Sequence, residues 1–123
     1  MLKSSFGKYL KQLRISKVPM VTQEQLATRV HRNKMTICQL ENGKNAPPKG
    51  KLLNDIIGAL SLTKEEEQKL RLLAAKERNS LPDDVSDYFY SHPCIYKLIE
   101  MAKRKALSDK HWEKLFEVFG DSK

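Results

Sequence analysis

The sequence has only two cysteines and no long apolar run, and each shortage excludes a class of protein. Cys38 and Cys94 lie far apart and lack metal-ligand spacing, so we interpret them as reduced thiols, with a disulfide as the less favoured alternative. No apolar stretch is long enough to span a bilayer, and MLKSSFGKYLKQLR contains no secretory signal. The expected protein is globular and cytoplasmic, without a membrane partner.

Catalytic and metal-binding patterns are also missing. His31, His92 and His111 are scattered, with no carboxylate or cysteine at catalytic or ligand spacing. The five glycines form no phosphate-binding cluster, and neither H-E-x-x-H nor G-x-S-x-G occurs. The adjacent acids Asp83 and Asp84 are typical of a helix start. We therefore expect no enzymatic activity, no metal and no cofactor.

Basic charge is present in excess, and it is confined to one half of the chain. The whole chain has 23 Lys and Arg against 15 Asp and Glu, a net charge of +8. Residues 1–50 contain ten basic residues and two acids, and thus hold all of this excess. The asymmetry fits either a nucleic-acid face or a basic surface that merely faces solvent.

Apolar residues recur at helical spacing along the chain, while alternating strand patterns are absent, which predicts an all-α fold. A first helix should follow Ser4 or Ser5 as its cap and end before Val18-Pro19, because the residue before a proline avoids the helical region. Further helices are expected at 23–30, 34–42, 49–60, from residue 64 onward, 83–90, 93–105 and 108–119.

Helix ends have recognisable signals. Thr22 with Gln25 forms a capping-box pattern, and Asn33 and Thr63 are good caps for the helices that follow them. Gly43 is the residue type that ends a helix. Pro48 is expected to serve in the first turn of the 49–60 helix. The segment 79–82 is the most plausible boundary, which gives domains at 1–78 and 79–123.

Residues 22–42 are expected to form two short helices with a tight turn between them, as in a helix-turn-helix. By itself this pattern also fits plain helix packing. The stretch contains Gln23, the pair Leu26-Ala27, Ile37, Leu40 and the run Glu41-Asn42-Gly43-Lys44. In these residues the chain resembles the lambda-repressor-like (XRE) helix-turn-helix family of transcriptional regulators. The resemblance covers about residues 6–62 and not the tail.

The resemblance implies a five-helix lambda-repressor-like domain followed by a short helical extension. It also implies a sequence-specific regulator of bacterial or phage origin, acting as a repressor, that binds double-stranded DNA at a pseudo-palindromic operator. Its helix at about 33–42 would read the major groove. The base-reading residues carried across are Lys34, Met35 and Gln39, with Thr36 as a possible fourth.

Other residues would position the domain on the phosphate backbone. Arg14 and Glu41 are expected to form a structural ion pair. The chain departs from the family in two places: His31 stands where the family usually has glycine, and the loop ISKVPMV is longer than usual. The expected phosphate contacts are Gln23, Arg32, Asn42, Lys44 and Asn45, with Lys8, Arg29 and Lys49 as diffuse contributors.

The tail at 79–123 matches no specific motif, and three interpretations of it remain. It can form a homodimer, which would place two recognition helices one DNA turn apart. It can instead dock a toxin, in which case the chain would be an antitoxin that represses its own operon. It can also simply cover the apolar faces of the fourth and fifth helices.

Overall fold

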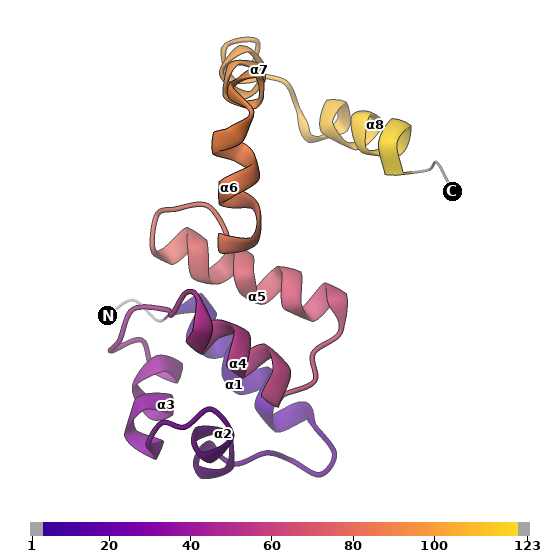
Figure 1. Cartoon of the computed structure of the whole chain (residues 1–123). Helices are drawn as coiled ribbons and strands as arrows, with labels where there is room; N and C mark the ends of the chain where they lie inside the picture. Colours follow the sequence, from indigo (N-terminus) through magenta and orange to yellow (C-terminus); the bar gives the residue numbers. More distant parts are fainter. Residues whose placement is uncertain (1–3, 121–123) are drawn as a thin grey trace. The chain divides into compact units, whose positions relative to one another are not determined.

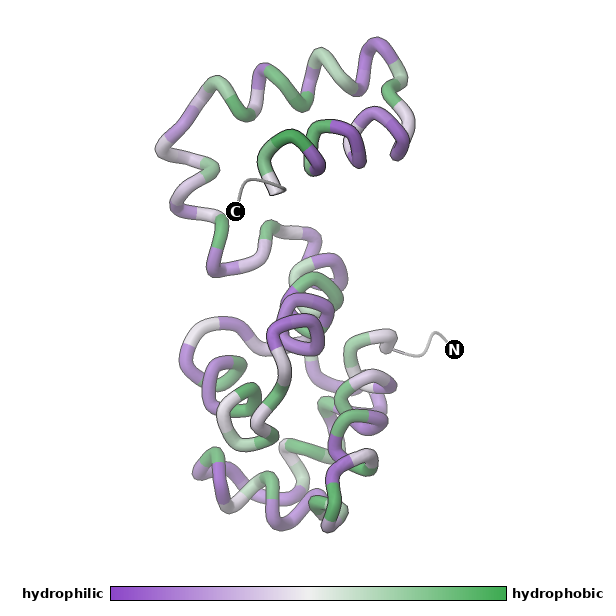
Figure 2. Tube along the Cα trace, turned by 90° about the vertical axis from the view of Figure 1, so that its right-hand side faces the viewer, coloured by the Kyte–Doolittle hydropathy of each residue, from purple (hydrophilic) through white to green (hydrophobic). Residues whose placement is uncertain are grey.

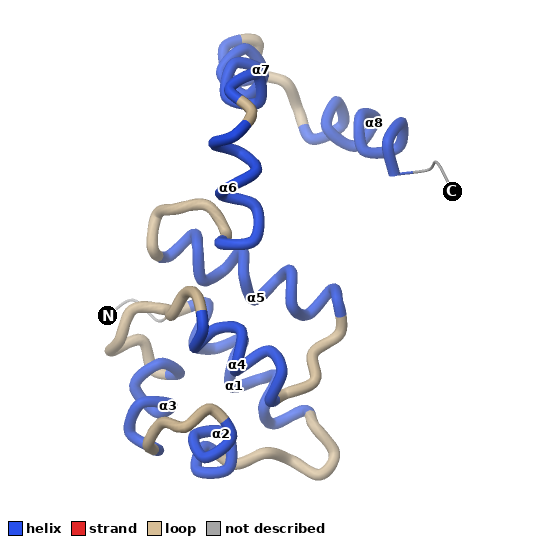
Figure 3. The backbone as a smooth tube through the Cα atoms, in the orientation of Figure 1, coloured by secondary structure: helices blue, strands red, loops and turns tan. Residues whose placement is uncertain are grey.

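The computed structural model describes residues 4–120, and within that range the chain has eight helices and no strand (Figure 3). This confirms the prediction of an all-α protein. The helices are α1 (Ser5–Ser16), α2 (Gln23–Arg29), α3 (Lys34–Glu41), α4 (Lys51–Ala59), α5 (Lys64–Glu77), α6 (Asp83–Ser91), α7 (Pro93–Arg104) and α8 (Asp109–Gly120).

The helix ends lie close to the predicted positions, with one correction. Ser4, Thr22, Asn33 and Thr63 cap α1, α2, α3 and α5 as expected. The prediction for Pro48 was wrong, because α4 begins only at Lys51. Gly50 precedes α4 with a φ of 66°, a conformation that glycine adopts without the steric cost met by other residues.

The chain divides into two compact units, Met1–Ser86 and Asp87–Lys123, so the division falls inside α6. Asp83 begins α6, yet its carboxylate accepts a hydrogen bond from the Gly50 amide at 2.6 Å. The segment after residue 78, which the sequence assigns to the tail, therefore begins within the first unit.

The first unit is built from α1 to α5 around one apolar core. In this unit α1 packs against α3 and α5, and α2 packs against α3 and α4 (Figure 1). Each helix buries one apolar stripe and leaves its polar side in solvent, as amphipathic helices do. The largest fully buried side chains are Phe6, Leu10, Leu26, Val30, Ile37, Leu53, Ile56, Leu60 and Leu70.

The start of α1 is held by the end of α5. The Glu77 carboxylate accepts hydrogen bonds from the Phe6 amide and from the Ser4 hydroxyl, both at 2.7 Å. A carboxylate at a helix N-terminus satisfies amides that have no partner within the helix, and it interacts favourably with the helix dipole. This contact joins residues more than 70 positions apart.

The start of α5 carries a charged cap. Glu66 accepts from the Thr63 amide at 3.0 Å and lies 3.6 Å from the Lys17 ammonium. The pKa of Glu66 lies below its ordinary value of 4.5. The hydrogen bond from the Thr63 amide is the main cause, and the positive charge of Lys17 lowers the pKa further, whereas burial acts in the opposite direction. The ionised carboxylate therefore stabilises the fold above pH 4.5, and this contribution is lost as the pH falls through the lowered pKa.

The second unit contains most of α6 together with α7 and α8. Ala102 is its only buried apolar residue among the described positions. Figure 2 shows apolar residues along both α7 and α8. In the described part of the chain, no helix is long and apolar enough to cross a membrane.

Candidate nucleic-acid interface

The candidate site is the pair α2 and α3 with the turn between them. The capping box at the start of α2 is complete: Thr22 accepts from the Gln25 amide, and the Gln25 side chain accepts from the Thr22 amide. Asn33 starts α3 by accepting from both the amide and the hydroxyl of Thr36, at 2.9 and 3.0 Å. These local bonds set where each helix begins.

The turn between the helices contains His31 at a φ of 60°. The sequence places a histidine where the family usually has glycine, and the structure shows the left-handed conformation that a glycine would adopt more easily. After His31, the Arg32 amide donates a hydrogen bond to the Ala27 carbonyl of α2 at 2.9 Å, which closes the turn. The turn keeps its tight geometry without glycine.

A buried polar cluster ties α1, α2 and α3 together. Arg14 on α1 donates twice to the Glu41 carboxylate on α3, at 2.6 and 2.8 Å, and once to the Val21 carbonyl at 3.0 Å. The Gln23 side chain on α2 donates to Glu41 at 2.9 Å. Arg14 and Glu41 are both buried, and removing one partner of such a pair typically costs about 3–5 kcal/mol. We call these residues the Arg14–Glu41–Gln23 cluster.

The cluster gives Gln23 a role that the sequence did not predict. Gln23 was expected only as a phosphate contact, but its amide nitrogen also bonds to Glu41, at the C-terminal end of α3. An amide nitrogen carries two hydrogens, so one remains for a second acceptor. The first residue of α2 is therefore positioned by α3.

The outer face of α3 carries the predicted base-reading residues. Met35 is 61% exposed and Lys34 is also exposed, while Thr36 and Gln39 are half-buried. On the inner face Ile37 is fully buried. Asn33 is exposed and caps α3, as its position in the sequence predicted.

The chain turns sharply after α3 and folds back on Gln39. Gly43 has a φ of 82°, and the amides of Lys44 and Asn45 both donate to the Gln39 carbonyl, at 2.9 and 3.2 Å. The Asn45 side chain donates to the Gln39 side-chain oxygen at 3.0 Å. The turn thus fixes the orientation of the Gln39 amide, a contact that no local sequence pattern indicated.

Four of the five predicted phosphate contacts gather at one end of α3. Gln23 lies there through its bond to Glu41, and Asn42, Lys44 and Asn45 follow the helix directly. Arg32 does not join them, because it precedes the N-terminus of α3, about 12 Å away along a helix of this length. Its side chain is exposed and donates to the His31 carbonyl at 3.3 Å.

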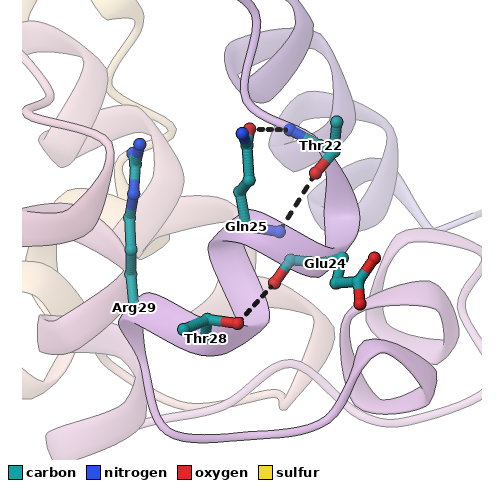
Figure 4. Close-up of a pocket in the computed structure, with 5 residues that line it drawn as sticks. All are labelled: Thr22, Glu24, Gln25, Thr28 and Arg29. Atoms are coloured by element: carbon teal, nitrogen blue, oxygen red, sulfur yellow. Dashed lines mark hydrogen bonds between the residues drawn. The ribbon is translucent and has the colours of Figure 1, made fainter.

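A shallow pocket lies along α2, but its polar groups are used locally. Figure 4 shows Thr22 and Gln25 bonded to each other and the Thr28 hydroxyl bonded to the Glu24 carbonyl. Arg29, which also lines the pocket, donates to the Ala59 carbonyl at 3.1 Å. These contacts stabilise the helix and hold it to α4. Among residues 4–120, no group of three His, Cys, Asp or Glu side chains could hold a metal ion.

Comparison of the chain with family models, with curated proteins and with solved structures gave no significant match.

Proposed function

We propose that the first unit is a lambda-repressor-like helix-turn-helix domain that binds double-stranded DNA sequence-specifically, and that the protein is a transcriptional repressor. In this proposal α1 to α5 form the domain and α3 enters the major groove. The observation that carries this proposal is the pair of α2 and α3, which the Arg14–Glu41–Gln23 cluster holds together. This pair presents exposed polar side chains, and it lies in the half of the chain that holds all the excess positive charge.

The Arg14–Glu41–Gln23 cluster supports this function because it holds α1, α2 and α3 in a fixed arrangement. A helix that reads base edges must keep its orientation relative to the phosphate contacts on either side of it. Glu41 at the end of α3 accepts from both α1 and α2, so the two helices cannot shift independently. Preorganised contacts reduce the ordering cost of binding.

The side chains on the outer face of α3 have the chemistry that base reading requires. A glutamine can form two hydrogen bonds with adenine, a lysine can donate to guanine, and an apolar side chain can pack on the thymine methyl group. Gln39, Lys34 and Met35 match these three roles. The Gln39 oxygen has two lone pairs, so it can accept from adenine while it keeps its bond from Asn45.

The backbone contacts follow from the same geometry. The second hydrogen of the Gln23 amide nitrogen remains available for a phosphate oxygen. Lys44 and Asn45 are exposed in the turn that follows α3. We assign Asn42 to the same group and Arg32 to a separate phosphate at the other end of α3.

Replacing Gln39 by alanine should relax the sequence preference without abolishing binding. The expected loss is about 1–3 kcal/mol at the base pair that Gln39 reads, and little on non-specific DNA. Gln23→Ala should instead weaken binding to all duplexes about equally, because phosphates carry no sequence information. Selection of bound duplexes from a random pool, followed by binding measurements on the selected site, checks both expectations.

The matched control is Gln68→Ala, which removes the same side chain from an exposed position on α5. It should leave both affinity and preference unchanged. Because Gln23 also bonds to Glu41, thermal unfolding of each variant must accompany the binding data. An unchanged selection profile for folded Gln39→Ala would refute the assignment of α3 as the reading helix.

A further inference from the structure

Gln39 is held at two points by the turn that follows α3. Its backbone carbonyl accepts from the amides of Lys44 and Asn45, at 2.9 and 3.2 Å, and its side-chain oxygen accepts from the Asn45 side-chain nitrogen at 3.0 Å. Gly43, with a φ of 82°, lets the chain reverse directly after the helix. Asn45 is exposed and Gln39 is half-buried, so the two paired amides lie at the surface of the proposed reading helix.

The bond from Asn45 restrains the amide group of Gln39. A side-chain amide has an acceptor oxygen and a donor nitrogen, and a half-turn about its last bond exchanges their places. An unrestrained glutamine can present them in either order, whereas the bond from Asn45 keeps the Gln39 oxygen beside the turn. The Gln39 nitrogen then lies on the side of the amide away from that bond. The pair therefore fixes the order in which Gln39 offers its acceptor and its donor.

This order matters because base pairs differ in it. In the major groove adenine presents the acceptor N7 beside the donor N6, whereas a C·G pair presents the donor N4 of cytosine beside the acceptor O6 of guanine. An amide that can turn fits either pattern. An amide held in one order fits one pattern and sets donor against donor on the other. Restraint of Gln39 thus adds discrimination between bases to the contact itself.

We propose that Asn45 is a specificity-determining residue that acts through Gln39, by positioning the Gln39 amide to match N6 and N7 of adenine. This role rests on the proposed function, in which α3 enters the major groove. The Gln39 oxygen keeps a second lone pair for N6, and the Asn45 nitrogen keeps a second hydrogen for a phosphate oxygen. Asn45 therefore connects a backbone contact to a base contact, and its loss should change both affinity and sequence preference.

Selection of duplexes from a random pool by the full-length chain tests this role. The base pair that Gln39 reads is the one whose preference changes in Gln39→Ala. The net value of a neutral hydrogen bond corresponds to about 2- to 10-fold in an equilibrium constant, and Asn45→Ala should reduce the adenine preference there by about that factor. In a Gln39→Ala background, Asn45→Ala should leave this preference unchanged, because no amide remains to be oriented.

Asn45→Asp tests the direction of the bond, because a carboxylate has the same shape but can only accept. It should draw the Gln39 nitrogen toward the turn and leave the oxygen outward, so adenine should be selected less often than by Asn45→Ala. Lys44→Ala is the matched control in the same turn. The bond from Lys44 to Gln39 is made by its backbone amide, which alanine keeps, so affinity should fall on all duplexes while the preference stays that of the wild type.

The restraint itself can be measured without DNA. NMR relaxation of the side-chain amide nitrogens should show an ordered Gln39 amide in the wild type and a mobile one, on the picosecond to nanosecond timescale, in Asn45→Ala. Thermal unfolding should differ little between the two proteins, because Asn45 is exposed.

Three outcomes would overturn the role of Asn45. They are an adenine preference that Asn45→Ala leaves unchanged, an effect of Asn45→Ala on that preference that persists without Gln39, and a Gln39 amide that is equally mobile with and without Asn45. A wild type that selects no duplex at all would instead refute the proposed function, and the relaxation data would still report whether Asn45 holds Gln39.

Discussion

Gly7 lies where α1 comes closest to the end of α3. A Cβ built at this position would lie 2.3 Å from the Glu41 carbonyl oxygen and 2.6 Å from that of Leu40. Both are backbone atoms of α3, so they cannot move aside without moving the helix. Gly7 therefore sets the distance between α1 and α3 that the Arg14–Glu41 bonds require. Gly58 on α4 would meet nothing within 4 Å.

Substitution of these two helical glycines by alanine should have opposite effects. Gly7→Ala should lower the free energy of unfolding by about 1–3 kcal/mol or more, because it overpacks a close helix contact. Gly58→Ala should raise it by about 0.4–1 kcal/mol, because alanine restricts the unfolded chain. Urea denaturation of both variants measures the difference, and equal effects would contradict the close approach of α1 and α3.

The N-terminus of α4 shows how one element depends on another far along the chain. Gly50 provides no side-chain cap, and the Asp83 carboxylate from the start of α6 accepts from its amide instead. Arg78, at the end of α5, donates to the Pro48 carbonyl at 2.8 Å and lies 3.5 Å from Asp83. Together, Asp83 and Arg78 hold the loop between Lys44 and α4 in place. In our proposal, Lys44 contacts the DNA backbone.

Removing the Asp83 carboxylate should therefore loosen the start of α4. Asp83→Ala should lower the free energy of unfolding by about 1 kcal/mol, the usual cost of a lost cap, and speed hydrogen exchange at the Gly50 amide. Asp84→Ala is the matched control, because Asp84 is exposed and has no hydrogen bond or ion pair within residues 4–120. Similar exchange at Gly50 in the two variants would exclude the capping role of Asp83.

At the scale of the molecule, charge and apolar surface are separated. Residues 1–50 hold the whole net charge of +8, while 13 of the 18 exposed large apolar residues lie from Val85 onward. If the proposed function holds, the first unit supplies the DNA contacts. The pseudo-palindromic operator that the family resemblance implies would contain two half-sites separated by whole helical turns of DNA.

The salt dependence of DNA binding should report on single phosphate contacts. Each contact made by a basic side chain contributes about 0.9 to the slope of log affinity against log salt. Lys44→Ala should therefore reduce the steepness of this slope by about 1. Lys76→Ala removes the same charge from an exposed position on α5 and should not change it. A slope unaffected by Lys44→Ala would remove Lys44 from the set of phosphate contacts.

The sequence by itself determined the helices and most of their caps. Helical periodicity and capping depend on residues three or four positions apart, so Thr22 with Gln25, Asn33 and Thr63 could be assigned from local pattern. The pairing of Arg14 with Glu41 came from a family resemblance, and the structure shows the ion pair. The start of α4 was misplaced, because its cap comes from a residue 33 positions away.

Only the tertiary structure decided which residues hold these helices together. Glu77 reaches α1, Asp83 reaches Gly50, and Gln23 reaches Glu41, across separations of 71, 33 and 18 residues. No short-range pattern specifies such contacts, because they arise when packing of the core brings distant backbone amides and carboxylates together. The same holds for Gly7, whose sequence context looks ordinary although its missing side chain lets α1 approach α3.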